Sequence, residues 1–183
     1  LWFSDNPKVN NNVIRAINGA AIFSTAAINQ SATGRIQMFD GSVMTWSGGS
    51  LSGGTLESGG NGSYATSGSA YLRTFTNNAR INILSGHSTF TDGNNVITNN
   101  GLMKVGDSAA TTTAVYYMQN GNPSLLGNGS LILDANPANL DLAQISFWGG
   151  GEVLTNGVDH TIGGTGRIRS FLTNNGNLTP GPI

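Results

Sequence analysis

Two short stretches that start 22 positions apart, Phe75-Thr76-Asn77-Asn78-Ala79 and Ile97-Thr98-Asn99-Asn100-Gly101, share the pattern apolar-Thr-Asn-Asn-small. The pattern returns at Leu172-Thr173-Asn174-Asn175-Gly176, and a shortened copy, Leu154-Thr155-Asn156-Gly157, starts 18 positions before it. A phrase that recurs at a nearly fixed spacing is typical of a solenoid, in which each repeat forms one coil and contacts only its neighbours.

A second phrase, TGRIxxF, supports the same interpretation. It occurs as Thr33-Gly34-Arg35-Ile36-Gln37-Met38-Phe39 and again 132 positions later, from Thr165 to Phe171. The starts of the first phrase are 22, 57 and 18 positions apart, where 57 is close to three periods. The distance between the TGRI copies fits about seven periods, so we expect coils of about 20 residues.

The composition favours a folded chain of stacked coils over a disordered one. Gly, Asn, Ser and Thr number 27, 23, 18 and 18, which is nearly half of the 183 residues. Disordered chains combine low hydrophobicity with high net charge, whereas this chain is 38% hydrophobic with a net charge of −1. Only 9% of its residues are charged, and scarce charge suits strands that place like side chains about 4.8 Å apart.

Paired asparagines are candidates for stacking between coils. Asn77-Asn78 and Asn99-Asn100 are 22 positions apart, which is one period. Asparagine side chains in successive strands can exchange hydrogen bonds in a ladder. The alternative is that both pairs are loop residues.

Short strand-like segments alternate with turn signals from about Ile36 onward. The predicted strands are 35–38, 42–46, 71–75, 80–84, 95–98, 102–105, 114–118, 130–133, 144–147, 152–155 and 166–171. Asn-Gly dipeptides, which mark tight turns, start at Asn61, Asn100, Asn120, Asn128, Asn156 and Asn175. Hairpins of an antiparallel β-sandwich use the same turns, but they do not require a recurring phrase. The sequence therefore predicts an all-β chain, a right-handed parallel β-helix of roughly eight to nine coils.

The first thirty residues differ from the rest. Val13–Asn18 and Ala20–Phe23 form a dense apolar stretch, which can be an amphipathic helix interrupted at Gly19 or the first one or two coils. Because the open end of a solenoid needs an atypical covering segment, we divide the chain into a lead-in or cap (residues 1–30) and β-helix coils (residues 31–183).

The other end, residues 178–183, shows no capping pattern. An uncovered last coil leaves a strand edge that can pair with more chain. The sequence therefore predicts that this end meets further β-helix protein or an identical subunit. In the second case subunits stack end to end into a fibre, and residues 2–23 cover the last coil of the next subunit.

Several phrases resemble those of a known class of proteins. Trp46-Ser47-Gly48-Gly49-Ser50-Leu51-Ser52-Gly53 and Leu172-Thr173-Asn174-Asn175-Gly176-Asn177-Leu178-Thr179-Pro180-Gly181 are similar to the "WxGGxLxG" and "LxNNGxLxPG" phrases of secreted bacterial parallel β-helix proteins, the autotransporter-like passenger domains and filamentous adhesins. The resemblance covers roughly residues 36–181. It implies an extracellular or cell-surface β-helix and no particular ligand.

Pairs of carboxylates raise the alternative of a polysaccharide-degrading enzyme, a lyase or a hydrolase. Asp134 and Glu152 are 18 positions apart, and so are Asp141 and Asp159. If each pair stacked on one face, it could serve as nucleophile and acid, or hold Ca²⁺. The opposing interpretation is that all four point into solvent near turns. Arg167 and Arg169 follow about one coil after Glu152 and can neutralise it.

Other polar motifs predict no cofactor or metal. His87 and His160 are isolated and lack ligand neighbours at useful spacing, so each is expected to be a turn histidine. The Gly-rich segments 149–151 and 163–166 lack the Lys-Ser/Thr of a phosphate loop and are expected to form corners.

Aromatic residues are expected mainly to fill the core; they are Phe39, Trp46, Tyr71, Phe75, Phe90, Tyr117, Phe147 and Phe171. Tyr116 adjoins Tyr117, and Trp148 adjoins Phe147. Because alternation in a strand turns one residue of each pair outward, Tyr116 and Trp148 are the candidate binding residues, which could contact sugar or another protein.

The remaining composition narrows the functional class. Without cysteine there is no disulfide framework and no thiolate metal site. No run of 18 apolar residues exists to span a membrane. A pI near 6 makes nucleic acid an unsuitable partner. We expect a non-enzymatic, structural or adhesive segment of a secreted or cell-surface bacterial protein, with surface glycans among its conceivable partners.

Overall fold

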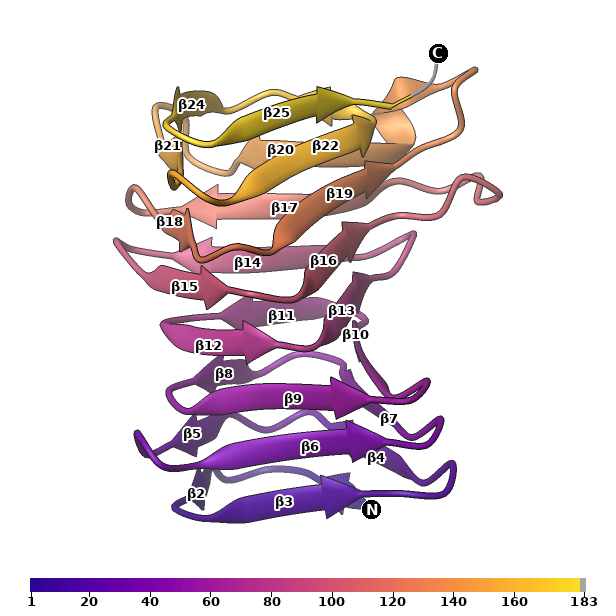
Figure 1. Ribbon diagram of the computed structural model, residues 1–183, viewed down its shortest axis with the longest axis vertical. Helices are drawn as coiled ribbons and strands as arrows, with labels where there is room; N and C mark the ends of the chain where they lie inside the picture. Colours follow the sequence, from indigo (N-terminus) through magenta and orange to yellow (C-terminus); the bar gives the residue numbers. More distant parts are fainter. Residues whose placement is uncertain (182–183) are drawn as a thin grey trace.

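The computed structural model describes residues 1–181, whose coils stack along one long axis so that their strands line up as three parallel β-sheets (Figure 1). One sheet has nine strands and the other two have eight each. The chain visits the sheets in a fixed order, A, B and C, and then returns to A one level higher. It completes eight coils and adds one further strand of sheet A. The predicted right-handed parallel β-helix of eight to nine coils is confirmed.

The strands are short and lie in register with the coil below. Sheet A contains β1 (Trp2–Phe3), β4 (Ala21–Ser24), β7 (Val43–Trp46), β10 (Ser63–Thr66), β13 (Arg80–Ile83), β16 (Leu102–Val105), β19 (Ser130–Asp134), β22 (Thr161–Thr165) and β25 (Asn177–Pro180). Sheet B contains β2 (Lys8–Asn10), β5 (Ile28–Gln30), β8 (Ser50–Ser52), β11 (Ser69–Leu72), β14 (Ser88–Asp92), β17 (Ala114–Gln119), β20 (Ala143–Phe147) and β23 (Arg167–Ile168). Sheet C contains β3 (Val13–Ala16), β6 (Arg35–Phe39), β9 (Thr55–Gly59), β12 (Phe75–Asn78), β15 (Val96–Asn99), β18 (Ser124–Leu126), β21 (Val153–Asn156) and β24 (Phe171–Asn174). A single 3₁₀ turn, η1 (Leu140–Leu142), precedes β20.

The copies of one recurring phrase occupy equivalent positions in the coil, and the copies of the other do not. Every copy of the apolar-Thr-Asn-Asn phrase lies in sheet C, where Phe75 pairs with Ile97 and Leu154 with Leu172. The TGRI copies are not equivalent, because Arg35 begins a strand of sheet C and Arg167 begins a strand of sheet B.

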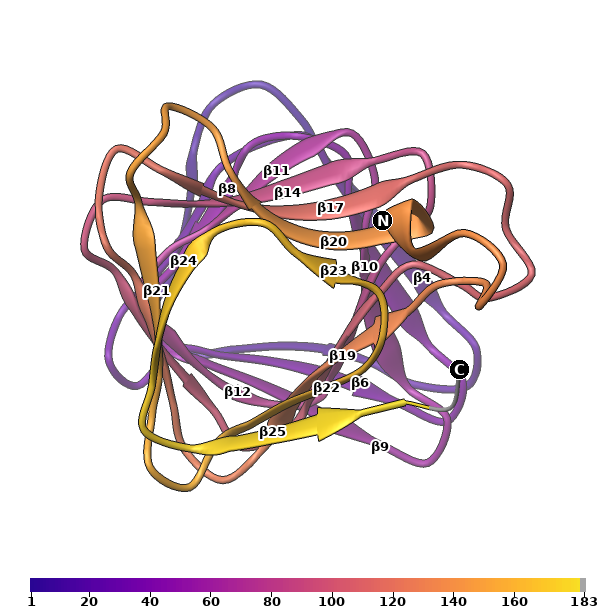
Figure 2. The same cartoon turned by 90° about the horizontal axis from the view of Figure 1, so that it is seen from above.

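The coils are also less uniform than predicted. The 57 positions from Ile97 to Leu154 cover two coils, β15 to β18 to β21, and not three. The sixth and seventh coils are lengthened by the loops of residues 106–113, 135–142 and 148–152. The first two of these loops project at one side when the molecule is viewed along its axis (Figure 2).

The N-terminal thirty residues form strands, not a helix. They contribute β1 to β5, which pair in parallel with the coils above them. The suggested amphipathic helix is therefore wrong, and the alternative of first coils is confirmed. The first coil is still atypical, because Lys8 pairs with the buried Ile28 and its ammonium group donates to the Ser4 carbonyl at 2.9 Å.

Inward-facing side chains stack from coil to coil and fill the interior. In sheet A one column of register partners runs through Ile22, Met44, Tyr64, Ile81, Met103, Leu131, Ile162 and Leu178. All but Leu178 are buried. Burying a side chain of this size contributes roughly 1.5–3 kcal/mol. The stacked columns are the main source of stability, as expected for a solenoid.

Asparagines also stack, as the sequence predicts. The Asn77 amide donates to Asn99 Oδ1 at 2.7 Å inside the coil, and Asn100 donates to Asn78 Oδ1 at 2.9 Å on the outside. Asn77 and Asn99 are fully buried. Because buried polar groups cost free energy unless they are hydrogen-bonded, the ladder satisfies both amides where solvent is absent.

His160 extends this ladder across a break in the register. Ile97 pairs with Leu125, which pairs with Asn156, so Asn156 does not continue the column of Asn99. The His160 ring bridges the gap, with Nε2 2.9 Å from Asn99 Nδ2 and Nδ1 2.7 Å from Asn156 Oδ1. Asn156 in turn donates to Asn174 Oδ1 at 2.7 Å. His160 is thus a fully buried structural residue and not merely a turn histidine.

The ladder requires a neutral imidazole. Asn99 offers an N–H group to Nε2, and Asn156 offers a carbonyl oxygen to Nδ1, so the fitting tautomer carries its proton on Nδ1. Burial lowers the pKa of His160 to about 4. Protonation of Nε2 would place its N–H group against the N–H group of Asn99, so that two donors would face each other.

Candidate functional site: the outer face of sheet B

Two rows of outward-facing side chains run along sheet B, parallel to the long axis. The first row contains Tyr71, Phe90, Tyr117 and Ser146, which are register partners in successive strands. The second row contains Arg73, Asp92, Gln119 and Trp148. Asp92 pairs with Gln119, and the Trp148 amide donates to the Met118 carbonyl at 2.9 Å, which places Trp148 beside Gln119.

The three rings of the first row form a stack. Tyr71 and Phe90 have ring centroids 5.1 Å apart, and Phe90 and Tyr117 have centroids 5.3 Å apart, with nearly parallel planes. Stacked aromatic pairs contribute about 0.5–1.5 kcal/mol beyond the area they bury. Phe90, in the middle, is almost completely covered.

Trp148 lies across the edge of this stack. Its ring centroid is 5.4 Å from that of Phe90 and 5.3 Å from that of Tyr117, and its plane is roughly perpendicular to both rings. Because the Trp148 ring is equally distant from two stacked rings, it lies beside the stack and not between the two rings. At such a short distance a perpendicular ring fits there only if one of its faces covers the edges of Phe90 and Tyr117. The other face points to solvent, and the residue is 60% exposed.

For one of the two candidate binding residues, Tyr116, the predicted exposure is wrong. Tyr116 pairs with Thr89 and Ile145 on the inside of the coil and is 0% exposed. Its hydroxyl lies 2.7 Å from Thr91 Oγ1, and burial raises its pKa to about 12. Alternation does separate Tyr116 from Tyr117, as predicted, but Tyr117 is the outward one. In Ala-Val-Tyr-Tyr-Met-Gln both faces read as apolar, so the sequence alone does not tell them apart.

Several aromatics expected in the core also lie elsewhere. Trp46 and Phe75 are buried as predicted. Tyr71, Phe90 and Tyr117 instead build the outer stack. Of the remaining three, Phe39 is half-buried, and Phe147 and Phe171 lie exposed in the last coils. A sequence signal for the outer stack was present, because alternation in Ser69-Ala70-Tyr71-Leu72 places Tyr71 on the same face as the polar Ser69 and opposite the two aliphatic residues.

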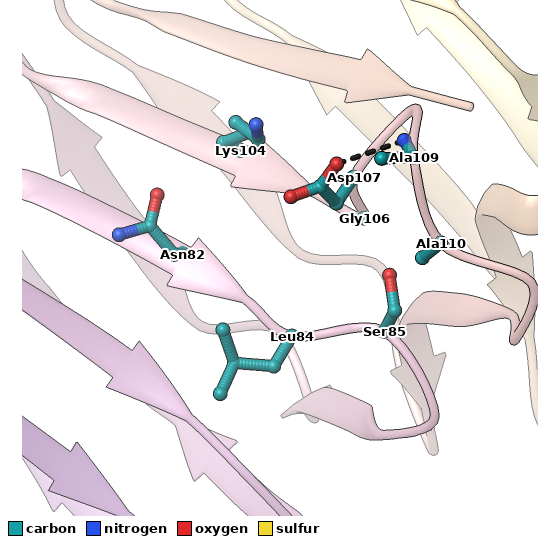
Figure 3. Close-up of a pocket in the computed structure, with 8 residues that line it drawn as sticks. All are labelled: Asn82, Leu84, Ser85, Lys104, Gly106, Asp107, Ala109 and Ala110. Atoms are coloured by element: carbon teal, nitrogen blue, oxygen red, sulfur yellow. Dashed lines mark hydrogen bonds between the residues drawn. The ribbon is translucent and has the colours of Figure 1, made fainter. Parts of the chain in front are cut away.

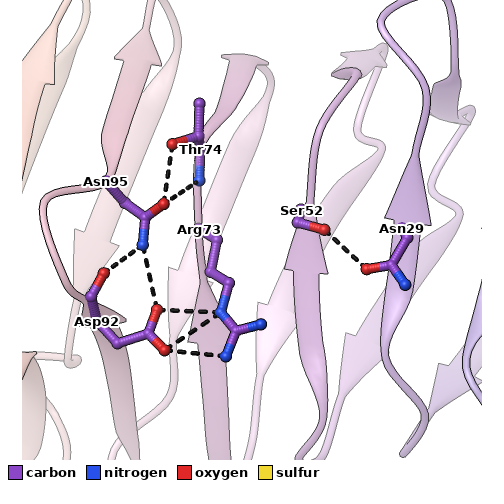
Figure 4. Close-up of polar contacts among 6 residues, drawn as sticks. All are labelled: Asn29, Ser52, Arg73, Thr74, Asp92 and Asn95. Atoms are coloured by element: carbon purple, nitrogen blue, oxygen red, sulfur yellow. Dashed lines mark hydrogen bonds and ion pairs between the residues drawn. The ribbon is translucent and has the colours of Figure 1, made fainter.

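The polar groups beside the stack are fixed by one another (Figure 4). Arg73 donates from Nε and Nη2 to the two oxygens of Asp92 at 2.9–3.2 Å, a bidentate pair. This hydrogen bond raises the pKa of Arg73. Asn95 donates to Asp92 Oδ1 at 3.2 Å and accepts from Thr74 Oγ1 at 2.9 Å. Nearer the N-terminal end of the same sheet, Ser52 donates to Asn29 Oδ1 at 2.8 Å. Bidentate arginine–carboxylate pairs are geometrically well defined, so the Asp92 carboxylate has a fixed orientation.

A pocket of about 430 Å³ lies beside the loop of residues 106–113, where sheet A turns into sheet B (Figure 3). Its lining includes Asn82, Ser85, Lys104 and Asp107. Asp107 accepts a hydrogen bond from the Ala109 amide at 2.9 Å, and Lys104 is paired with Asp134 at 2.6 Å. The charged groups of this pocket are therefore committed to the local structure.

The carboxylate pairs that suggested an enzyme are not neighbours. Asp134 ends β19 in sheet A and pairs with Thr165, whereas Glu152 lies at the corner before β21. Asp141 lies in η1 between sheets A and B, and Asp159 lies in the turn between β21 and β22. The alternative in which these pairs stack on one face is therefore wrong, because the two members of each pair occupy different corners of the coil.

The two arginines expected near Glu152 bind Asp141 instead. Arg169 Nη2 and Arg167 Nη1 lie 2.7 and 3.0 Å from Asp141 Oδ1, and the hydrogen bond from Arg169 holds the pKa of Asp141 below its usual value. Glu152 accepts from the Gly149 amide at 3.1 Å. Burial tends to raise the pKa of Glu152, but backbone N–H groups outweigh it, and the pKa is lowered.

Within residues 1–181, no three His, Cys, Asp or Glu side chains gather closely enough to hold a metal ion. No helix in this described part of the chain is long and apolar enough to cross a membrane. Comparisons of the chain with protein-family models, with curated proteins and with solved structures found no match. The outer face of sheet B, which carries the aromatic stack and Trp148, is therefore the candidate site on the basis of its own geometry.

Proposed function

We propose that this chain is a non-enzymatic, structural and adhesive segment of a secreted or cell-surface bacterial protein, a rigid β-solenoid that presents the outer face of sheet B. The observation that carries the proposal is that the ion pairs of the molecule link one coil to the next. The ion pairs Arg35–Glu57, Arg73–Asp92, Lys104–Asp134 and Arg167/Arg169–Asp141 each join neighbouring coils. The charged groups thus connect coils and do not converge on a reaction centre.

The phrases shared with autotransporter-like passenger domains and filamentous adhesins support an extracellular or cell-surface location. The scarcity of charge suits a rod made of stacked coils, because like charges repeated at each level would repel. The alternative of a polysaccharide-degrading enzyme loses the carboxylate pairs on which it was based.

The proposal also states what covers the exposed apolar side chains of the last coils. Ile168 and Leu178 continue buried inward columns, one level above Ile145 and Ile162 respectively, yet they are 36% and 49% exposed. Exposed apolar groups next to unpaired strand edges favour pairing with more chain. We propose that further β-helix coils, or an identical subunit stacked end to end, cover them.

The proposal is tested with two readouts on one preparation. Electron microscopy should show narrow rods, single or joined end to end, and incubation with acidic and neutral polysaccharides should release no new chain ends. Turnover that is lost in Asp141→Ala would contradict the proposal in favour of the enzyme. Globular particles would contradict the rod.

A further inference from the structure

Trp148 is a preformed platform for a flat, weakly polar ligand. One face of its indole packs on the edges of Phe90 and Tyr117, and the other faces solvent. A side chain already held against a stacked pair loses little conformational freedom on binding. The C–H groups on one side of a pyranose ring carry partial positive charge, which complements the negative face of an aromatic ring.

Hydrogen-bonding groups lie at the neighbouring levels of the same row. Gln119 is one strand below Trp148, Asp92 one below that, and Arg73 the next. Gln119 ends in an amide, which can donate to one hydroxyl and accept from another. Arg73 and Asn95 fill most acceptor positions of the Asp92 carboxylate and hold it in place, so the position that they leave is defined before any ligand arrives.

The spacing of the row suits a polymer that runs along the long axis. Successive strands are about 4.8 Å apart, which is close to the length of one sugar unit in an extended polysaccharide chain. The Trp148 ring is about equally distant from Phe90 and Tyr117, so a sugar ring stacked on it would lie between the levels of Asp92 and Gln119, beside both side chains. The next sugar units would extend along the row to the neighbouring strands.

The chemistry of the face favours a glycan over a protein partner. Protein interfaces depend on several buried aromatic or aliphatic anchors over about 800 Å² per partner, whereas this face exposes one large aromatic surface among polar groups. The charges of Arg73 and Asp92 cancel within their pair. This absence of net charge favours a neutral ligand.

We propose that the outer face of sheet B binds a neutral polysaccharide along the solenoid axis, with one sugar ring stacked on the solvent-facing side of Trp148 and hydrogen-bonded at its edge by Gln119 and Asp92. The inference rests on the proposed function and deepens it, because it names the class of ligand for the adhesive surface.

Titration calorimetry with soluble β-glucan, mannan and galactan tests the inference. The unchanged protein should bind at least one of them, and Trp148→Ala should weaken that binding about tenfold or more, which corresponds to about 1.4 kcal/mol. Trp148→Phe, which keeps an aromatic face, should retain part of the affinity. The matched control is Trp2→Ala, because Trp2 is the other exposed tryptophan and also packs edge-on against a phenylalanine, Phe23. This variant should bind as the unchanged protein does.

Each other outcome contradicts the inference. Binding of none of the three polysaccharides, equal losses in Trp148→Ala and Trp2→Ala, or full affinity in Trp148→Ala would overturn it, provided that circular dichroism shows intact strands. Absence of binding in a preparation that forms rods and degrades nothing would refute the glycan site and leave the proposed function standing. Turnover of the polysaccharide would instead refute the proposed function.

Discussion

Replacing Trp46 with alanine should lower the free energy of unfolding by about 4 kcal/mol. Trp46 is the largest buried side chain of the molecule, and it stacks on Tyr64 with centroids 5.5 Å apart and planes 11° from parallel. Its removal leaves a cavity that the stacked coils can only partly close, since each side chain is held by register with the coils above and below. Urea unfolding followed by far-ultraviolet circular dichroism measures the loss.

Two further variants make this prediction specific. Trp2→Ala removes an exposed tryptophan of the same sheet and should cost less than about 1 kcal/mol. Trp46→Phe should cost clearly less than Trp46→Ala, because it keeps a ring against Tyr64 and deletes the indole N–H, which has no hydrogen-bond partner. If Trp46→Ala unfolded like Trp2→Ala, the inward stacking described for sheet A would be wrong.

Acid should destabilise the protein through His160. Because its pKa is lowered from 6.5 to about 4 in the folded state, the unfolded chain takes up the proton first as the pH falls. The stabilisation is complete above about pH 6.5, declines towards pH 4, and amounts to about 2–3 kcal/mol. Unfolding free energies measured by urea titration at several pH values between 4 and 7 should show this slope.

The matched variants isolate the contribution of His160. Glutamine can present an amide donor and an acceptor without titrating, so His160→Gln should flatten the slope between pH 4 and 6.5. His87→Gln is the matched control and should leave the slope as it is, because His87 takes no part in the Asn99–His160–Asn156 bridge. An unchanged slope in His160→Gln would show that the Asn99–His160–Asn156 bridge does not control the acid response.

The repeat in sheet C made the fold predictable. Phe75 and Ile97 are separated by one coil, and that single spacing requires parallel neighbours. The boundaries of the strands were less predictable. The predicted strand 71–75 runs across the corner at residues 73–74, and the predicted strand 166–171 runs across the corner at residues 169–170. Polar residues at such corners look the same as polar residues facing out of a strand. The inserted loops of the sixth and seventh coils carry no phrase, which made two coils look like three.

The candidate site could be predicted only in part. Trp148 was expected to be exposed, and it is. The outward side of Tyr117 could not be chosen over Tyr116, because that choice depends on Met118 and Ile145 facing inward in neighbouring coils. The pairing of Arg169 with Asp141 depends on a loop between sheets A and B, and residues 28 positions apart have no sequence signal to link them.

The most direct test of the whole account is a pair of engineered disulfides on sheet B, made possible by the absence of native cysteine. Ser69 and Ser88 are register partners facing outward in adjacent coils, at the strand spacing of about 4.8 Å that a disulfide can bridge. Ser69→Cys with Ser88→Cys should oxidise fully, as measured by thiol titration. Ser69→Cys with Val115→Cys, two coils apart, should stay reduced. Oxidation of the second pair, or failure of the first in folded protein, would contradict the coil register on which the site, the function and the glycan inference all depend.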